Sequence, residues 1–142
     1  NNVYVKSMTK YGTDGKTMLD AEDDAAHTAW GGSWRMPDAT EISELFQYCD
    51  VASVTINSVE GVRLISKKTM DEENFIFFPT TGYIEDASLQ DSWEIYFWSR
   101  TMYPFGDANY YRPGAYFGRY SFSASLNYGS RRLGLTIRPV CE

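Results

Sequence analysis

The sequence predicts an α+β domain in which two N-terminal helices pack on a mostly antiparallel sheet. Signals for helices are confined to residues 20–50, where caps and apolar spacings of three and four occur. From residue 51 onward, short apolar runs are separated by Gly, Pro, Asn and Asp, which is typical of strands and turns. Helices followed by a series of strands are characteristic of the α+β class.

Composition sets the limits on function. The 142 residues fit a single domain over 1–142, and the hydrophobic share of 43% and charged share of 23% are those of a folded protein. The net charge of -6, without a basic stripe, argues against nucleic-acid binding. No apolar run approaches the roughly 20 residues of a membrane span. Residues 1–6 do not resemble a signal peptide, so an exported protein would carry its signal or a preceding domain outside this sequence.

The first expected elements are a short edge strand at Val3–Val5 and an Asp-Gly turn within 11–16. Asp20 is the expected cap of a first helix over 21–30, because acidic residues follow it in the first turn. Gly31 and Gly32 end that helix. One face of this helix is expected to consist of small residues, which would let it approach a sheet closely: Ala21, Ala25, Ala26 and Ala29.

The second helix has stronger signals. Asp38 with Glu41 three residues later resembles a capping box. Apolar residues then recur at i, i+3, i+4 and i+7, which predicts one buried stripe of Ile42, Leu45, Phe46 and Cys49.

The remaining chain predicts strands. A hairpin is expected from 53–56 and 62–66 around a turn at 58–61, and 74–78 forms an apolar strand that Pro79 stops. Residues 100–114 contain two prolines and two glycines and are expected to form a loop. Three further strands are expected over 93–99, 115–122 and 135–140.

Several segments, taken in order, resemble the Fibrobacter succinogenes major paralogous domain, a family frequent in surface proteins of gut Bacteroidetes. The resemblance covers most of the chain, although each motif is weak alone. It rests on Asp23 to Ala26, Trp30 to Pro37, the helix Glu41 to Cys49, Ile76 to Tyr83, Tyr96 to Ser99, and Gly134 to Cys141.

The resemblance implies a C-type lectin-like fold, with adjacent termini and a long loop-rich face for ligands. Many relatives are similar to the variable proteins of diversity-generating retroelements, in which a segment ending in a motif like Arg138-Pro139-Val140 carries substituted positions. Residues 98–132 would be that segment here. The implied location is extracellular, on a cell surface or on a phage particle.

The two cysteines, Cys49 and Cys141, are compatible either with thiols in the core or with one long-range disulfide. In C-type lectin-like domains a helix cysteine commonly bridges to the last strand. The resemblance therefore implies a Cys49–Cys141 disulfide in an oxidising compartment.

The sequence indicates no catalytic machinery, so the protein is expected not to be an enzyme. His27 is the only histidine, and a triad or zinc site needs more partners. The fold is related to that of formylglycine-generating enzymes, but Cys49 and Cys141 look structural rather than reactive. The adjacent acids of 71–73 are typical of a solvated turn rather than of a glycosidase pair.

No metal or other cofactor is expected. The Glu-Pro-Asn, Gln-Pro-Asp and Trp-Asn-Asp motifs of calcium-dependent lectins do not occur. Asp86, Asp91 and Asp107 offer oxygen ligands, but scattered surface acids explain them better than a calcium site.

Arginines and tryptophans within the family-like motifs are expected to be structural. For Arg35 and Arg138 we expect buried pairing with a carboxylate or carbonyl. Trp30, Trp34 and Trp98 are expected in the core.

The region 93–128 holds 13 of the 23 aromatic residues, and its Tyr, Asn, Ser and Arg content resembles that of an antibody paratope. It predicts a noncatalytic, adhesin-like module that binds a protein or glycan. The alternative is a structural domain of a larger cell-surface or fimbria-like protein, with the aromatics packed on a neighbouring domain. Phe117 can replace Arg119 in the expected ligand-binding set, which is Tyr103, Phe105, Asp107, Asn109, Tyr110, Tyr111, Tyr116, Arg119, Tyr120, Asn127, Tyr128 and Arg132.

Overall fold

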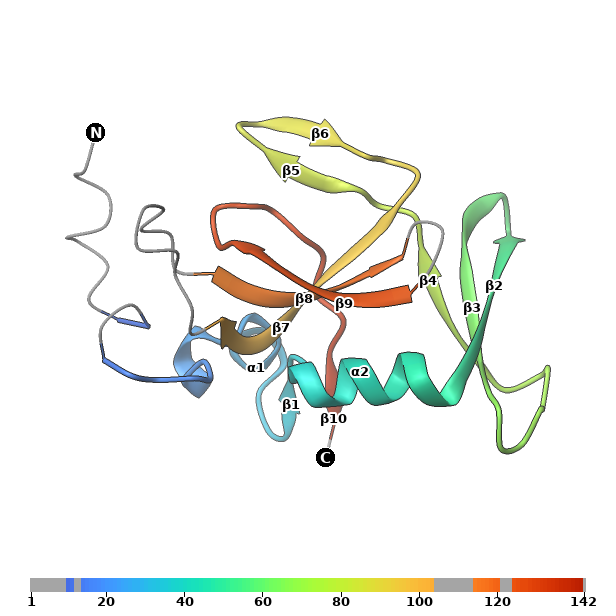
Figure 1. Ribbon diagram of the computed structural model, residues 1–142, viewed down its shortest axis with the longest axis horizontal. Coiled ribbons are helices and arrows are strands. Elements are labelled where there is room, and N and C mark those ends of the chain that lie inside the picture. The colour runs from blue at the N-terminus through green and yellow to red at the C-terminus, as the bar shows by residue number, and fades with distance from the viewer. Residues whose placement is uncertain (1–9, 12–13, 104–113, 121–123, 142) are drawn as a thin grey trace.

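Short helices precede a series of antiparallel strands along the chain (Figure 1), which confirms the α+β class and the mostly antiparallel pairing. The computed structural model describes residues 10–11, 14–103, 114–120 and 124–141, of which 114–120 by their backbone alone. The helical elements are η1 (Ala21–Asp23), α1 (Ala25–Trp30) and α2 (Ala39–Tyr48). The strands are β1 (Trp34–Arg35), β2 (Cys49–Ile56), β3 (Val59–Ser66), β4 (Phe75–Pro79), β5 (Tyr83–Glu85), β6 (Ser88–Gln90), β7 (Ile95–Tyr103), β8 (Gly114–Tyr120), β9 (Ala124–Ser130) and β10 (Val140–Cys141).

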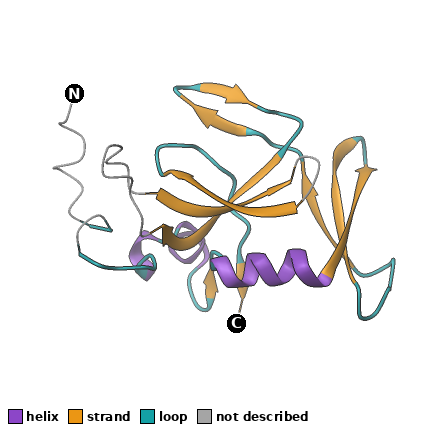
Figure 2. Cartoon of the chain, in the orientation of Figure 1, coloured by secondary structure: helices purple, strands orange, loops and turns teal. Residues whose placement is uncertain are grey.

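The strands form four small sheets rather than one (Figure 2). Their orders are β1-β10, β2-β3-β4, β5-β6 and β7-β8-β9. Helix α2 contacts both three-stranded sheets, whereas α1 packs mainly on η1 and β1. The expectation of two helices packed on a sheet is therefore met by α2 alone. None of the helices within the described residues has the length and apolarity needed to cross a membrane.

The first helix begins later than predicted, and Asp24 rather than Asp20 caps it. The Asp24 carboxylate is buried and accepts hydrogen bonds from the N–H groups of Ala26 at 2.9 Å and His27 at 3.1 Å. The Asp20 carboxylate instead binds Lys16 at 2.5 Å. Asp20 precedes the 3-10 turn η1, not the helix α1. Gly31, with φ of 68°, ends the helix as predicted. The expected small-residue face is wrong, because Ala26 is its one buried member.

Helix α2 has the predicted capping box. The Asp38 side chain accepts from the Glu41 N–H at 2.9 Å, and the Glu41 carboxylate accepts from the Asp38 N–H at 2.8 Å. Glu41 is also held by both terminal nitrogens of Arg35, at 2.7 and 2.8 Å. The structural role expected for Arg35 is thus confirmed.

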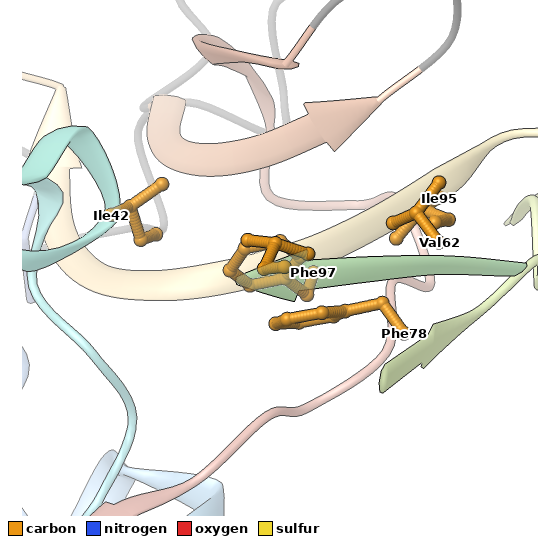
Figure 3. Close-up of a cluster of buried hydrophobic side chains, with 6 residues drawn as sticks. Ile42, Val62, Phe78, Ile95 and Phe97 are labelled. Atoms are coloured by element: carbon orange, nitrogen blue, oxygen red, sulfur yellow. The ribbon is translucent and has the colours of Figure 1, made fainter. Parts of the chain in front are cut away.

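The core lies between α2 and the two three-stranded sheets (Figure 3). Phe97 of β7 is at its centre, with ring centroids 4.9 Å from Phe78 and 6.2 Å from Phe46. The buried members are Ile42, Val62, Leu64, Phe78, Ile95 and Phe97. The predicted helical stripe is confirmed, since Ile42 belongs to this cluster and Leu45, Phe46 and Cys49 pack against it.

The hairpin β2–β3 is longer than predicted, and its turn is Asn57-Ser58 rather than 58–61. Both turn residues have positive φ, 49° and 65°, as a two-residue hairpin turn requires. The ladder therefore continues through Val59 and Gly61. A Cβ at Gly61 would lie 2.2 Å from the Phe78 carbonyl oxygen, so only glycine allows β4 to pair this closely.

Strand β7 extends to Tyr103 and is interrupted by a bulge between Trp98 and Met102. The predicted loop from 100 onward therefore begins too early. Strand β9 was not among the predicted strands, and its Ser, Asn and Gly residues are poor strand formers. Pairing with β8 along its whole length overrides that local preference.

The predicted strand over 135–140 is reduced to β10 and two isolated bridges. Gly134 pairs with Ile84, Thr136 pairs with Phe97, and Pro139 has no N–H to offer a ladder. Strand β10 instead pairs with β1, which places Cys141 opposite Trp34.

The predicted disulfide between Cys49 and Cys141 is not formed, and both residues are thiols. Their strands belong to different sheets: Cys49 pairs with Ser66 in β2–β3, and Cys141 pairs with Trp34 in β1–β10. Burial raises the pKa of the Cys49 thiol.

Two of the three tryptophans expected in the core are at the surface. Trp30 is 59% exposed and Trp34 is 37% exposed, and their rings meet edge to face at 4.9 Å. Trp98 is partly buried. Arg138 is exposed and lies over the Phe78 ring at 5.1 Å, so its expected buried polar pairing is wrong.

The expected edge strand at Val3–Val5 lies outside the described residues. The expected closeness of the termini involves the same segment and residue 142, so it lies outside them as well.

Replacing Asp24 with alanine should destabilise the fold by about 2–4 kcal/mol, because a helix cap is lost and buried donors are left without an acceptor. The donors include the Met36 N–H at 3.0 Å in addition to those of α1. Chemical denaturation measures the change. Asp20→Ala is the control, because Asp20 is half-buried and makes no capping bond; this variant should unfold close to the wild type. Equal stabilities of the two variants would contradict this role of Asp24.

Acid should weaken the contribution of Glu41 to stability. The hydrogen bonds from the Arg35 guanidinium lower the pKa of Glu41 below its usual value of 4.5. A carboxyl whose pKa is lower in the folded state stabilises above the unfolded pKa and loses this effect as pH falls through the folded pKa. The unfolding free-energy difference between wild type and Glu41→Gln should be constant over about pH 5–7 and shrink below that range. Glu44→Gln, which removes a carboxylate from the exposed face of α2, is the matched control for the loss of one acidic side chain from this helix.

Candidate functional site

The structure describes part of the predicted ligand-binding set. Tyr103 ends β7, Asn127 and Tyr128 lie within β9, and Arg132 follows β9. The backbone positions of Tyr116, Arg119 and Tyr120 fall on β8. Five further members lie outside the described residues, namely Phe105, Asp107, Asn109, Tyr110 and Tyr111.

The strand register shows that the set does not share one surface. Tyr116 is opposite Tyr128, and Tyr120 is opposite the core residue Ile95. Alternate residues of a strand belong to opposite faces, so Arg119 lies on the other face of the sheet from Tyr116 and Tyr120. Pairing with β7 therefore divides the β8 positions of the predicted set between the two faces of the sheet.

Tyr103 and Tyr128 form the aromatic centre of the described part of this region. Their ring centroids are 3.9 Å apart and their planes differ by 3°, so the rings are stacked. Tyr128 is 59% exposed, and Tyr103 is partly buried. In the register, Gly114 of β8 is the partner of Tyr103, and glycine has no side chain to stand between rings that come from the two outer strands. The rings therefore meet over β8, with Tyr128 as the exposed member of the stack.

Asn127 and Arg132 are engaged within the molecule. The Asn127 amide donates to the Ser125 hydroxyl at 2.7 Å. Arg132 forms an ion pair with Glu85 and lies 4.0 Å from Asp86. Exposed ion pairs contribute little stability, so a ligand carboxylate can compete for Arg132.

The hairpin β5–β6 beside this region was not predicted. Its turn residues, Asp86 and Ala87, both have positive φ, at 47° and 65°. The available signal was the short alternation on either side of Asp86-Ala87, but alanine in place of glycine made it weak. Ile84 and Leu89 are cross-strand partners, 44% and 56% exposed, so the hairpin presents an apolar pair to solvent.

Two of the three acidic residues considered for calcium lie beside polar groups of the protein, and Asp107 is outside the described residues. Asp86 lies near Arg132, and Asp91 lies 3.2 Å from the Tyr96 hydroxyl oxygen. The predicted solvated turn at 71–73 is confirmed, since the Asp71 carboxylate accepts from the Glu73 N–H at 3.0 Å.

Within the described part of the chain, one group of acids is close enough to share a cation: Asp20, Glu22 and Asp23. Lys10 already lies among them, 2.6 Å from Glu22 and 3.3 Å from Asp20, with Asp23 as its third partner. These hydrogen bonds, led by the one to Asp23, hold the pKa of Lys10 well above its usual value. The lysine therefore occupies the position that a metal ion would take.

The other chemically active groups have structural partners. The Nδ1 atom of His27 is 3.3 Å from the Trp34 carbonyl oxygen, so this histidine has a main-chain partner within the molecule. Glu94, which sequence reasoning did not single out, is buried and accepts a hydrogen bond from the Tyr96 hydroxyl. Charged residues are seldom buried without a partner, and here the partner follows two residues later.

Comparison with protein-family models, with curated proteins and with solved structures finds no match to this chain.

The stacking of Tyr103 on Tyr128 should be measurable as coupling between two mutations. A double-mutant cycle with Tyr103→Ala and Tyr128→Ala should give an interaction energy of about 0.5–1.5 kcal/mol, the usual range for aromatic pairs. Tyr48, an equally exposed tyrosine on α2, supplies the control cycle with Tyr103. Additive effects in both cycles would contradict the stacking.

Proposed function

We propose that this protein is a noncatalytic, adhesin-like recognition module that binds a glycan or a protein through the aromatic surface of β7-β8-β9. The observation that carries the proposal is the stacking of the exposed Tyr128 ring on Tyr103. Tyrosine gives a large contact area at a low cost in side-chain entropy, and its hydroxyl adds a directional hydrogen bond.

The stack has the properties of a binding platform. Its planar face can pack against the C–H side of a sugar ring or an apolar side chain of a protein. Arg132 lies beyond the end of β9 and supplies a charged group at the margin, in a pair that a ligand can displace. Hydrophobic contact surrounded by polar groups is the usual arrangement of an interface.

The proposal includes a C-type lectin-like fold of the Fibrobacter major paralogous type, with an extracellular, cell-surface or phage-particle location. The antiparallel pairing of β1 with β10, which joins an early strand to the last one, supports it. Residues 98–132, the proposed variable segment of a retroelement-diversified protein, span the second part of β7 and all of β8 and β9.

A structural role in a larger surface or fimbria-like protein is the second candidate. The exposed pair of Ile84 and Leu89 favours it, because an apolar pair on a two-stranded hairpin is suited to contact with a neighbouring domain.

A glycan array, probed with calcium and with chelator, tests the proposal. Tyr128→Ala should weaken a bound glycan about tenfold or more, since loss of a central aromatic contact costs about 2 kcal/mol. Tyr48→Ala removes a tyrosine of equal exposure on α2 and should bind like the wild type. The response to chelator distinguishes calcium-dependent from direct binding.

The same array distinguishes the two candidates. Equal loss of binding in both tyrosine variants would overturn the assignment of the surface. A blank array excludes common glycans and directs the search to a protein ligand. If binding to a neighbouring domain fails in an Ile84→Ser/Leu89→Ser variant but survives Tyr128→Ala, the structural role replaces recognition.

A further inference from the structure

A polar cleft of about 300 Å³ lies between α1, β1 and the bulge of β7, apart from the tyrosine surface. Figure 1 shows these elements together at the lower side of the molecule. Its lining includes Arg100 from the bulge, Arg35 and Trp34 from β1, Ser33, and Asp24 and His27 from the first helix and its cap. Sequence reasoning did not consider Arg100, because that residue begins the expected loop.

The bulge directs Arg100 toward this cleft. Its backbone leaves the ladder with β8: the N–H donates to the Pro37 carbonyl and the carbonyl accepts from the Leu19 N–H, both at 2.9 Å. Bulges re-aim side chains in this manner and are common beside functional sites. The main chain around Arg100 is thus fixed on both sides.

One N–H of the Arg100 guanidinium, that of Nε, lacks an acceptor within the described part of the chain. Its Nε atom is buried and has no hydrogen-bond partner among the described residues. A buried N–H without an acceptor costs free energy, and an ion or ligand is one of the ordinary reasons for finding one.

The carboxylates of the same region are already bound. Glu41 accepts two hydrogen bonds from Arg35 and one from the Asp38 N–H. Asp24 accepts from the N–H groups of Ala26, His27 and Met36. Arg35 and Glu41 form an ion pair, and Asp24 is held by backbone donors. The Nε–H of Arg100 is therefore the donor in this cleft that, among the described residues, still needs an acceptor.

We propose that this cleft binds the carboxylate group of a small organic molecule, with Arg100 as its principal donor and Trp34 as its apolar wall. A guanidinium and a carboxylate match in plane and can form two parallel hydrogen bonds. Trp34 is partly exposed and stands edge to face with Trp30, which gives the organic part of the ligand an aromatic surface. That wall favours an organic carboxylate over an inorganic oxyanion. Asp24 adds a negative charge that disfavours a multiply charged ligand.

This site does not depend on the proposed recognition function. The tyrosine stack lies beyond the bulge in β7, whereas Arg100 lies within it.

Titration of the intact protein with benzoate, acetate and inorganic phosphate, at constant ionic strength, tests the proposal. The reporter is the Nε–H resonance of Arg100 in proton–nitrogen NMR, which a buried N–H makes observable. Benzoate should shift it saturably, and should bind about threefold to tenfold more tightly than acetate because of the aromatic wall. Phosphate should produce no saturable shift.

Single substitutions test the roles of Arg100 and Trp34 separately. Arg100→Gln should abolish benzoate binding, read at the backbone amides of Gly32 and Ser33, and Trp34→Leu should reduce benzoate affinity to that of acetate. Arg63→Gln removes an arginine outside the cleft and should bind like the wild type. If Arg100→Gln does not fold, the wild-type titration decides. A flat response to all three probes, a response to phosphate alone, or unchanged binding in Arg100→Gln would overturn the proposal.

Discussion

The bulge in β7 between Trp98 and Met102 joins the separate parts of this structure. Before it, β7 lies in the core and pairs with β8 in regular register. Within it, Arg100 binds the N-terminal segment and the approach to α2 through its backbone, and the Thr101 hydroxyl accepts the first N–H of α2, from Ala39, at 2.9 Å. After it, the ladder with β8 resumes and brings Tyr103 to its stacked position. The bulge thus provides hydrogen bonds between segments that belong to different small sheets and helices.

The two proposed sites follow from the two sides of this junction. The tyrosine stack depends on regular pairing across β8, which fixes the distance between the outer strands. The cleft at Arg100 depends on the interruption of that pairing, which turns a charged side chain away from the ladder. Strand β7 therefore contributes to both sites: Arg100 lines the polar cleft, and Tyr103, three residues later, belongs to the tyrosine stack.

Part of the site was accessible from the sequence, and part was not. The aromatic richness of 93–128 directed attention to Tyr103 and Tyr128, and both are in the exposed stack. Composition could not show which faces of β8 the residues share, since a register shift of one residue exchanges the faces. Composition also could not identify Arg100. In the sequence, a strand with a bulge that is soon followed by Pro and Gly has the same pattern as a loop.

The sequence by itself determined the features that depend on neighbouring residues. These are the capping box of Asp38 and Glu41, the buried stripe of α2, the end of α1 at Gly31, and the α+β class. Only the tertiary structure decided the features that depend on distant partners. Asp24 is held at the start of α1 because the distant Met36 N–H also binds its carboxylate, and β9 is a strand because β8 pairs with it along its length. Cys49 and Cys141 stay apart because their strands join different sheets. Local preferences amount to tenths of a kcal/mol per residue, so long-range burial and pairing override them wherever the two disagree.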